Sequence, residues 1–513
     1  MDLQRDTIAT AVEEARRQDR LFAAGIALMV NGKVQLRTTA GAHDLTPFEI
    51  GSITKLLTTT LAIRTGIDLD APVEDLVSGF FFGDRRGARV TLRHLLTHSS
   101  GLPAAGRDWG PADPEALSRF VMTDLANHRF HAGPGEVGCY SSTAISLVGL
   151  VLQEITGSRF PDLFRSQVLE PAGMTGSGFP SEIDPGRVSW PHSRVGGTWQ
   201  PVLRLADNPA VYPSGFLLAT LDDMAHLALT VLEGGLIGGV DGLIATTVPR
   251  WIDHTRSPHG RASAAYGLGS FTGDWSGQTV IRHGGGQLTS NCSVDFFPET
   301  DSAVVLLTNG ADDATFMELL SLCYQVVAGP PDEMSPLVMQ VPDPSRQQAA
   351  VGTFLDVDSG SMLTIGATEE NRLFIDREGG RTRLDYVGDH RWIASGRGDE
   401  TPIGIPWDGD PAAHVFVWGN PHVRIDLPDV EVKTDGGRLC GVYADSFWDH
   451  PESRLVVDGS GGELVVTGEG FVSAARPIGP LRLISDHGLL EFEENGTGMV
   501  LGNATRYVRI ADR

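Results

Sequence analysis

A serine and a lysine three residues apart are the part of this sequence that most directly suggests chemistry. Ser52 and Lys55 lie in an apolar stretch, 48–60, whose pattern is typical of the start of a helix. Residues three apart share one face of a helix, so the hydroxyl and the amine would be neighbours. If apolar neighbours bury the lysine, desolvation disfavours its charged form, and the neutral amine can accept the serine proton. The spacing predicts an activated serine nucleophile at the positive end of a helix dipole.

The same pair also has a purely structural interpretation. Serine is a common N-cap residue, a helical lysine is usually solvated, and this spacing occurs by chance in many chains. On this stretch alone the structural interpretation is the stronger one. Two later stretches change the balance, because each offers a partner for a serine nucleophile.

A tyrosine and a glycine-flanked histidine are these later partners. Tyr140 lies just before a helix-like run, and a phenol near a cationic lysine is expected to have a lowered pKa and to act as general acid or base. His283 precedes Gly284, Gly285 and Gly286, and tandem glycines let a ligand approach the backbone closely. His283 would then hold a substrate carbonyl or carboxylate. The structural alternatives are a buried tyrosine ring and a glycine turn.

Two histidines four residues apart raise a metal site as a different chemistry. His94 and His98 would lie on one helix face, but the His-Glu-x-x-His pattern and an evident third ligand are both missing from the sequence. We therefore expect these histidines to make structural hydrogen bonds, and we expect no metal.

The composition is that of a loop-rich globular chain with room for two to four domains. It has 513 residues, of which 41% are hydrophobic and 20% charged. The net charge is −25 and no basic run occurs, which argues against nucleic acid and anionic membrane surfaces as partners. We expect the acidity to serve solubility.

The cysteines and the N-terminal pattern favour a reducing compartment. Cys139, Cys292, Cys323 and Cys440 are far apart, with no Cys-x-x-Cys, so neither a disulfide framework nor a zinc site is indicated. The first residues form a charged amphipathic pattern without the features of a signal peptide, and no apolar run reaches membrane-spanning length. We expect a cytoplasmic protein.

The candidate residues need a scaffold, and the patterns predict helices with an antiparallel sheet. A helix is expected at 3–20, then a hairpin at 25–36, then the helix that carries the serine. Thr220 and Asp223 resemble a capping box, and the helix that they open would end near 234–235. Further strands and a closing helix are expected at 266–269, 279–281, 291–297, 303–308 and 317–327.

After this region the composition changes to short strands and turns. The Pro-rich stretch 329–344 reads as a linker. Segments 351–354 and 440–443 echo each other, and alternating strand-like runs follow each of them. We interpret the tail as two small antiparallel β-barrels, with one larger β domain as the alternative. The predicted divisions are a catalytic domain at 1–330, a linker at 331–345, and barrels at 346–430 and 431–513.

Taken in order, the three chemical stretches resemble the motifs of the penicillin-recognising serine hydrolases. This family comprises class C β-lactamases, DD-peptidases, related esterases and D-aminopeptidases. Its signature is Ser-x-x-Lys, then Tyr-x-Asn or Ser-x-Asn, then Lys-Thr-Gly or His-x-Gly. With flanking stretches similar to the class C branch, the resemblance covers roughly residues 5–330. The counterparts here are Ser52-Ile53-Thr54-Lys55, Tyr140-Ser141-Ser142 and His283-Gly284-Gly285.

The resemblance implies an α+β, β-lactamase/transpeptidase-like catalytic domain, with the site between a helical lobe and an antiparallel sheet. Ser52 would form an acyl-enzyme, and Lys55 and Tyr140 would handle the protons. The oxyanion would lie between the backbone N–H groups of Ser52 and Gly286. The residues implied in binding the substrate or the oxyanion are Ser142, His283, Gly284, Gly285 and Gly286.

Two positions depart from the family pattern. Ser142 stands where Asn is usual, and a hydroxyl reaches less far than an amide, which weakens the case for ordinary β-lactam or DD-peptidase chemistry. His283 replaces the lysine of true β-lactamases, and a neutral imidazole holds a carboxylate less strongly than an ammonium does. Family members with His there are often esterases and aminopeptidases. A catalytic domain followed by two barrels is closest in architecture to the D-aminopeptidases.

The leading hypothesis is therefore a cytosolic serine hydrolase that acts on small amides or esters, including peptides with D-residues. One alternative is a penicillin-binding-protein-type thioesterase or peptide cyclase, which transfers a peptidyl group to an amine. Another, from a different class, is a non-turnover sensor or inactive scaffold. We expect a small-molecule or short-peptide substrate, no cofactor, and no nucleic-acid or membrane partner. A homodimer is compatible with the sequence.

Overall fold

The computed structural model describes the chain from Asp2 to Asp512, with gaps. The segments outside the description are 105–108, 129, 203–206, 237–264, 332–338, 357–360, 371, 378–379, 389–390, 397–398, 406–411, 418–419, 426–438, 440, 446–454, 459–463, 469–470, 480–481, 486–487, 493–497 and 502–504.

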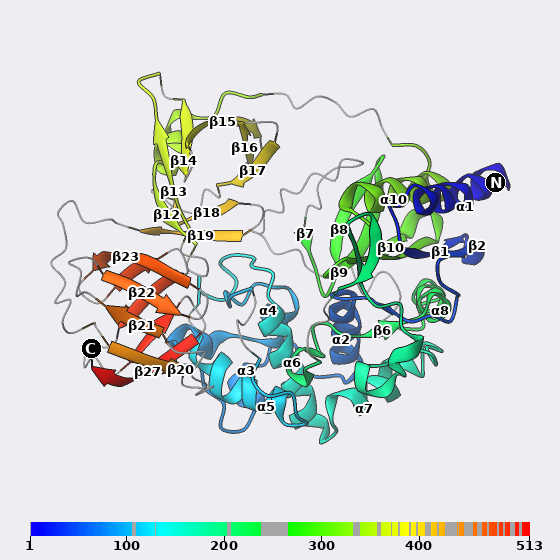
Figure 1. The fold of residues 1–513 in the computed structure, drawn as a ribbon, viewed down its shortest axis with the longest axis horizontal. Coiled ribbons are helices and arrows are strands. Elements are labelled where there is room, and N and C mark those ends of the chain that lie inside the picture. The colour runs from blue at the N-terminus through cyan, green and yellow to red at the C-terminus, as the bar shows by residue number, and fades with distance from the viewer. Residues whose placement is uncertain are drawn as a thin grey trace.

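A seven-stranded sheet with antiparallel neighbours forms the centre of the N-terminal part of the chain (Figure 1). Its order is β2-β1-β11-β10-β9-β8-β7, so the first strand of the chain, β1, pairs with β11, which lies far later in the sequence. The register of β1 on β11 runs from Ala23 opposite Asn309 to Met29 opposite Ala303. The strands are β1 (Ala23–Val30), β2 (Lys33–Ala40), β7 (Ala265–Tyr266), β8 (Phe271–Trp275), β9 (Gln278–Gln287), β10 (Ser290–Phe297) and β11 (Ser302–Asn309).

A helical lobe lies beside this sheet (Figure 1). Its central helix, α6, begins where the Ser141 side chain accepts from the Ala144 N–H (3.1 Å) and ends at Gly157, which has a left-handed φ of +66°. The helices of this part are α1 (Asp2–Arg17), α2 (Ile53–Arg64), α3 (Val73–Leu76), α4 (Leu92–Leu96), α5 (Ala116–Arg119), α6 (Ser142–Thr156), α7 (Phe160–Phe164), α8 (Leu221–Leu232) and α10 (Asp313–Ala328).

Shorter elements connect these helices and strands. Two small two-stranded sheets pair β3 with β6 and β4 with β5. Their bounds are β3 (Phe48–Glu49), β6 (Leu218–Ala219), β4 (His192–Val195) and β5 (Thr198–Pro201). The short 3₁₀ and π turns are η1 (Arg85–Arg89), η2 (Phe120–Asp124), η3 (Leu125–Asn127), η4 (Arg165–Leu169), η5 (Pro180–Glu182), η6 (Pro185–Arg187), η7 (Pro209–Val211) and η8 (Pro298–Thr300).

The central strands of the sheet are apolar on both faces, and helices cover each face. Leu306 of β11 belongs to a core that also contains side chains of α1 and α10. Its neighbour Leu307 points to the other face and belongs to the larger core, together with side chains of α2, α6 and α8. Successive residues of a strand point to opposite faces, so one strand can supply both cores. Helix α2 therefore lies buried between the sheet and the helical lobe.

Two closed eight-stranded barrels follow, coloured yellow to red in Figure 1. Each has its own apolar core. The helix α11 (Pro344–Ala350) leads into the first barrel. That barrel consists of β12 (Gly352–Leu355), β13 (Met362–Ala367), β14 (Leu373–Arg377), β15 (Gly380–Gly388), β16 (Arg391–Gly396), β17 (Asp399–Gly404), β18 (His414–Val417) and β19 (Asn420–Ile425). The second consists of β20 (Gly441–Asp445), β21 (Leu455–Asp458), β22 (Leu464–Gly468), β23 (Phe471–Gly479), β24 (Arg482–Ser485), β25 (Gly488–Phe492), β26 (Gly498–Leu501) and β27 (Thr505–Asp512).

The predicted fold class is confirmed: a helical lobe and an antiparallel sheet are followed by two antiparallel barrels. The capping box predicted at Thr220 is only half formed. The Thr220 hydroxyl accepts from the Asp223 N–H, but the Asp223 carboxylate accepts instead from the Gly176 N–H and the Ser177 hydroxyl. Much of the predicted linker, 332–338, lies outside the described residues. None of the helices that the structure describes is both long and apolar enough to cross a membrane.

Candidate active site

Ser52 occupies the N-cap position of α2, yet its side chain makes no capping hydrogen bond. The hydroxyl is instead the acceptor for the Lys55 amine, with 2.9 Å between Oγ and Nζ. This contact follows directly from the three-residue spacing on a helix. Ser52 therefore has the N-cap position that the structural interpretation expected, but its partly exposed side chain bonds to Lys55 and does not cap the helix.

Lys55 is buried, with a relative exposure of 1%. Every residue of α2 from 53 to 62 is buried, because the helix lies between the sheet and the helical lobe. The Lys55 amine also donates to the Ser214 carbonyl at 2.8 Å. Burial lowers the pKa of Lys55 to about 7, because the charged amine loses its hydration. The uncharged form of Lys55 that the sequence predicts is therefore well populated near pH 7.

Tyr140 lies on the chain segment that leads into α6, with its ring centroid 4.9 Å from the Lys55 amine. Burial raises the pKa of Tyr140 well above its usual range, and a hydrogen bond with the Ser52 side chain opposes only part of this shift. The expected lowering of this pKa is wrong, because desolvation of the phenolate dominates. Tyr140 is a protonated phenol at neutral pH, which leaves Lys55 as the group able to accept a proton.

The glycines after His283 let β9 lie directly against the turn before Ser52. A Cβ atom on Gly285 would come within 1.8 Å of the Ile50 carbonyl oxygen, so only glycine fits there. Gly51 has a φ of +51°, and a Cβ atom on it would lie 2.9 Å from the Gly286 nitrogen. The backbones of Ser52 and Gly286 are therefore near neighbours, as an oxyanion hole would require. That role stays a prediction.

His283 is buried, with 1% exposure, and both ring nitrogens have protein partners. Nδ1 lies 2.6 Å from the Gly284 carbonyl oxygen and therefore donates to it, which leaves Nε2 to accept from the Tyr266 hydroxyl at 3.2 Å. Burial, with a smaller effect of the Lys55 charge, lowers the pKa of His283 to about 3. The imidazole is neutral, so direct binding of a substrate carboxylate would require one of these bonds to break.

His98 is a site residue that the sequence interpretation missed. Its Nδ1 accepts from the Ser141 N–H at 3.1 Å, and its ring centroid lies 4.3 Å from that of Tyr140 and 4.6 Å from that of Tyr266. Burial lowers its pKa well below the usual value, so it is neutral. Its neighbour His94 has a separate partner, with Nδ1 3.0 Å from the Thr91 hydroxyl. These hydrogen bonds confirm the structural interpretation of the histidine pair, but the sequence pattern does not indicate that His98 supports Tyr140.

Ser142 begins α6 beside the site and is partly exposed. Its backbone N–H donates to the Ala104 carbonyl at 2.6 Å. The hydrogen bonds described for the Lys55 amine go to Ser52 and Ser214, and not to Ser142. Among the described contacts, the Ser214 backbone carbonyl therefore accepts from the lysine and the Ser142 hydroxyl does not. The structure brings Ser52, Lys55 and Tyr140 together and leaves Ser142 at the edge of this group.

Comparisons with known proteins identify the family and the fold. The sequence profile described as Beta-lactamase matches residues 8–321. The chain is 26% identical to "Penicillin-binding protein 4" of Amycolatopsis lactamdurans, over 63% of this chain and 92% of that protein. The structure of SurE superposes with a TM-score of 0.65 at 22% identity, covering 83% of this chain and 99% of that one. The structure of D-amino acid amidase from Ochrobactrum anthropi superposes with a TM-score of 0.53 at 18% identity, covering 64% of this chain and 98% of that one.

Proposed function

This chain belongs to the beta-lactamase family, and from that premise we propose that it is a serine hydrolase working through a Ser52 acyl-enzyme. The observation that carries the proposal is the 2.9 Å contact between the Ser52 hydroxyl and a buried lysine amine. A buried amine with a pKa of about 7 is a competent base at physiological pH, whereas a solvated lysine would be almost entirely protonated.

The residues support the following proton path. The neutral Lys55 amine takes the Ser52 proton as Oγ attacks the substrate carbonyl carbon, and the carbonyl becomes an oxyanion near the Ser52 and Gly286 N–H groups. The bond to the leaving amine or alcohol then breaks, and the leaving group takes a proton that Lys55 supplies through the Tyr140 phenol. An incoming water or amine reverses these steps, giving up its proton to Lys55 and releasing the acyl group from Ser52.

The substrate class that we propose is a small amide or ester, with a D-residue on the acyl side as the first candidate. Two structural neighbours support this choice by their titles alone: a D-amino acid amidase, and SurE, which has also been crystallised with D-Leu. The neutral, internally bonded His283 supports a substrate without a free carboxylate at that position. Transfer of the acyl group to an amine, as in a peptide cyclase, uses the same residues and differs only in the acceptor.

The test is intact-protein mass spectrometry after exposure to a fluorophosphonate probe, alongside p-nitrophenyl ester turnover. We expect a single adduct and continuing ester release from the wild type, and neither from Ser52→Ala. Ser158→Ala, which removes an exposed hydroxyl elsewhere, is the matched control and should behave as the wild type. An adduct without turnover would favour the sensor or an enzyme that requires an amine acceptor. A folded protein that forms no adduct would contradict the catalytic proposal.

With turnover established, D- and L-amino acid p-nitroanilides would identify the preferred stereochemistry. Adding a primary amine as acceptor would show whether water or amine takes the acyl group. Faster release of p-nitroaniline, with formation of the new amide, would favour the acyltransferase alternative over simple hydrolysis.

A further inference from the structure

The segment that carries Tyr140 runs as a strap across the molecule, and one side of it is fixed to the helical lobe. This tyrosine strap comprises residues 131–141, and its backbone is bonded to the turn that follows α4. The donor–acceptor pairs are His131–Gly101 (2.8 Å), Gly135–Ser99 (2.7 Å) and Cys139–His98 (2.8 Å), all between backbone N–H and C=O groups.

The other side of the strap is covered by the first barrel. All four residues of strand β18 are buried, although only Val415 and Val417 point into the barrel core. Phe416 points the opposite way, has 0% exposure, and forms an apolar cluster with Ala132 and Val137 of the strap. A barrel strand normally has one face toward solvent, so burial on both faces marks β18 as a contact strand.

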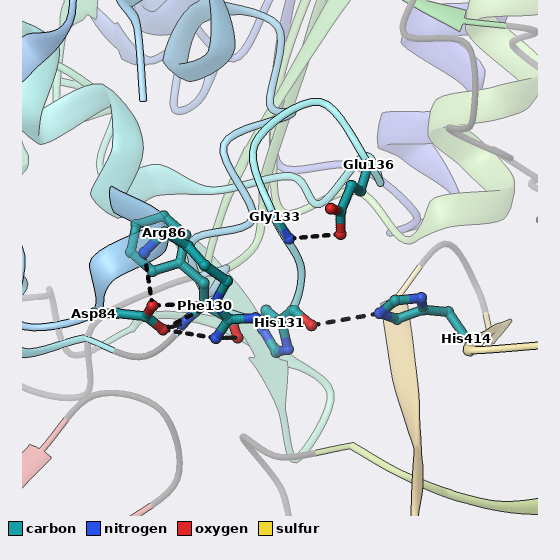
Figure 2. Close-up of polar contacts among 7 residues, drawn as sticks. All are labelled: Asp84, Arg86, Phe130, His131, Gly133, Glu136 and His414. Carbon is teal, nitrogen blue, oxygen red and sulfur yellow. Dashed lines mark hydrogen bonds and ion pairs between the residues drawn. The ribbon is translucent and has the colours of Figure 1, made fainter. Parts of the chain in front are cut away.

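A polar contact lies beside this apolar cluster. Figure 2 shows the His414 ring directed at the carbonyl of His131, with 3.4 Å between Nε2 and the oxygen. Just before the strap, the Phe130 carbonyl accepts from Arg86 at 2.8 Å, and Arg86 is itself paired with Asp84 (Figure 2). The strap is thus held at its beginning and lies between the barrel and the helical lobe.

The strap has little room to move without disturbing its inner neighbours. Gly101 has a φ of +81°, and a Cβ atom on it would lie 2.1 Å from the Ala132 carbonyl oxygen, so the two backbones are in direct contact. Close-packed interiors transmit displacement because few voids exist to absorb it. A shift of Ala132 or Val137 would therefore reach the backbone bonds at Gly101 and His98, and through them Tyr140.

From these contacts we infer that the first barrel positions Tyr140, with Phe416 as the positioning residue. The inference rests on the proposed function for its catalytic consequence, and on the packing alone for its structural one. Phe416 holds the outer side of the strap, so that the Tyr140 phenol stays within hydrogen-bonding reach of Ser52. Its removal leaves an unfilled space between barrel and strap, and the strap then opens more often.

Three full-length variants test this inference: Phe416→Ala, Phe416→Leu and Phe374→Ala. Phe374 is the matched control because it lies on the outer face of the same barrel, with its ring 3.9 Å from the Arg381 guanidinium carbon. The first measurement is hydrogen exchange of peptides covering 130–141, which needs no enzymatic activity. We expect exchange there to rise about tenfold in Phe416→Ala, less in Phe416→Leu, and not at all in Phe374→Ala.

The second measurement is ester turnover, with and without Tyr140→Phe. We expect Phe416→Ala to lower kcat about tenfold with little change in KM, and to add no further loss once Tyr140 is Phe. Phe416→Leu should recover most of the activity, which also guards against a misfolded alanine variant. Unchanged exchange of the strap, or an equal kcat loss in the Tyr140→Phe background, would overturn the inference. If the wild type shows no turnover, the proposed function fails, while the exchange measurement still decides whether the barrel holds the strap.

Discussion

The two halves of the candidate site are built in different ways. On one half, Ser52 and Lys55 lie on a single buried helix, and their contact depends only on the helical repeat. On the other half, Tyr140 and the β9 glycines reach the serine from distant parts of the chain, held by a histidine, a strap and close backbone approach. Local spacing can therefore set a nucleophile and its base, whereas the proton donor and the proposed oxyanion groups depend on tertiary packing.

Replacing the base on the helical half should have the largest effect. Lys55→Met keeps the length and apolar stem of the side chain but removes the amine, so kcat/KM for an activated ester should fall about a thousandfold. Stopped-flow labelling with the fluorophosphonate probe measures the effect at Ser52 itself. Labelling at the wild-type rate would show that the serine does not depend on this lysine.

A change on the sheet half should cost less while leaving the helical pair intact. Gly285→Ala places a Cβ atom against the Ile50 carbonyl, so β9 must shift away from Ser52 and kcat should fall about a hundredfold. The control is Gly83→Ala, where the nearest atom, the Ala126 carbonyl oxygen, is 3.5 Å from the new Cβ atom. Ester kinetics for both variants make the comparison. Wild-type kcat in Gly285→Ala would show that β9 does not contribute to the site.

The pH dependence separates the lysine from the tyrosine. Because burial lowers the pKa of Lys55 to about 7, the fraction of neutral amine rises with pH through this value. We expect kcat/KM to be about fiftyfold lower at pH 5 than at pH 7, and to level off above pH 8. Tyr140, whose pKa is raised, should add no second limb in this range. A rise centred near pH 10 would instead indicate a solvated, charged lysine.

The smallest effect on activity is expected for a buried acid on the opposite face of the same sheet, which should change stability instead. Asp295 of β10 has 0% exposure, and burial raises its pKa from 3.8 to about 6, with Arg282 opposing this in part. The native state therefore binds this proton more tightly than the unfolded state does. Its stabilising contribution is complete below about pH 4 and is lost as pH rises through 6, by about 2 to 3 kcal/mol. Urea unfolding at pH 4 to 8 measures this slope.

Asp295→Asn is the control for that slope, because the amide cannot titrate. The variant should show a flatter dependence of unfolding free energy on pH between 4 and 7 than the wild type. An unchanged slope would show that other carboxyl groups cause the pH dependence of the unfolding free energy. The two pH profiles compare two buried ionisable groups. Lys55 contacts the candidate nucleophile and should affect activity, whereas Asp295 should affect only stability.

The sequence predicted the helical half of the site better than the sheet half. The Ser52–Lys55 contact and the lowered lysine pKa follow from helix geometry and burial, both of which the apolar pattern reveals. The direction predicted for the Tyr140 pKa was wrong, because the desolvation of a phenolate depends on how deeply the ring is buried, which the sequence does not reveal. Ser214 and His98 were missed since a backbone acceptor and a supporting ring are recognisable only once distant segments meet.

The fold, like the site, was predictable where local sequence patterns determine it and not where distant segments meet. Periodicity and the echo between 351–354 and 440–443 indicated two barrels, each of which begins with a strand at that echo, β12 and β20. The contact between β18 and the tyrosine strap was not predictable, because the outward positions of a barrel strand carry no mark of their eventual neighbour.

The pairing of β1 with β11 has a consequence for biosynthesis. Residues near 25 leave the ribosome early, yet one edge of β1 gains its partner only when residues near 305 have also emerged. Until then the nascent chain holds an unpaired strand edge and two apolar faces, which is the kind of surface that chaperones bind. We expect translation arrested before residue 300 to give a chaperone-bound, protease-sensitive chain. Arrest beyond residue 330, with the tunnel cleared, should give the first compact state.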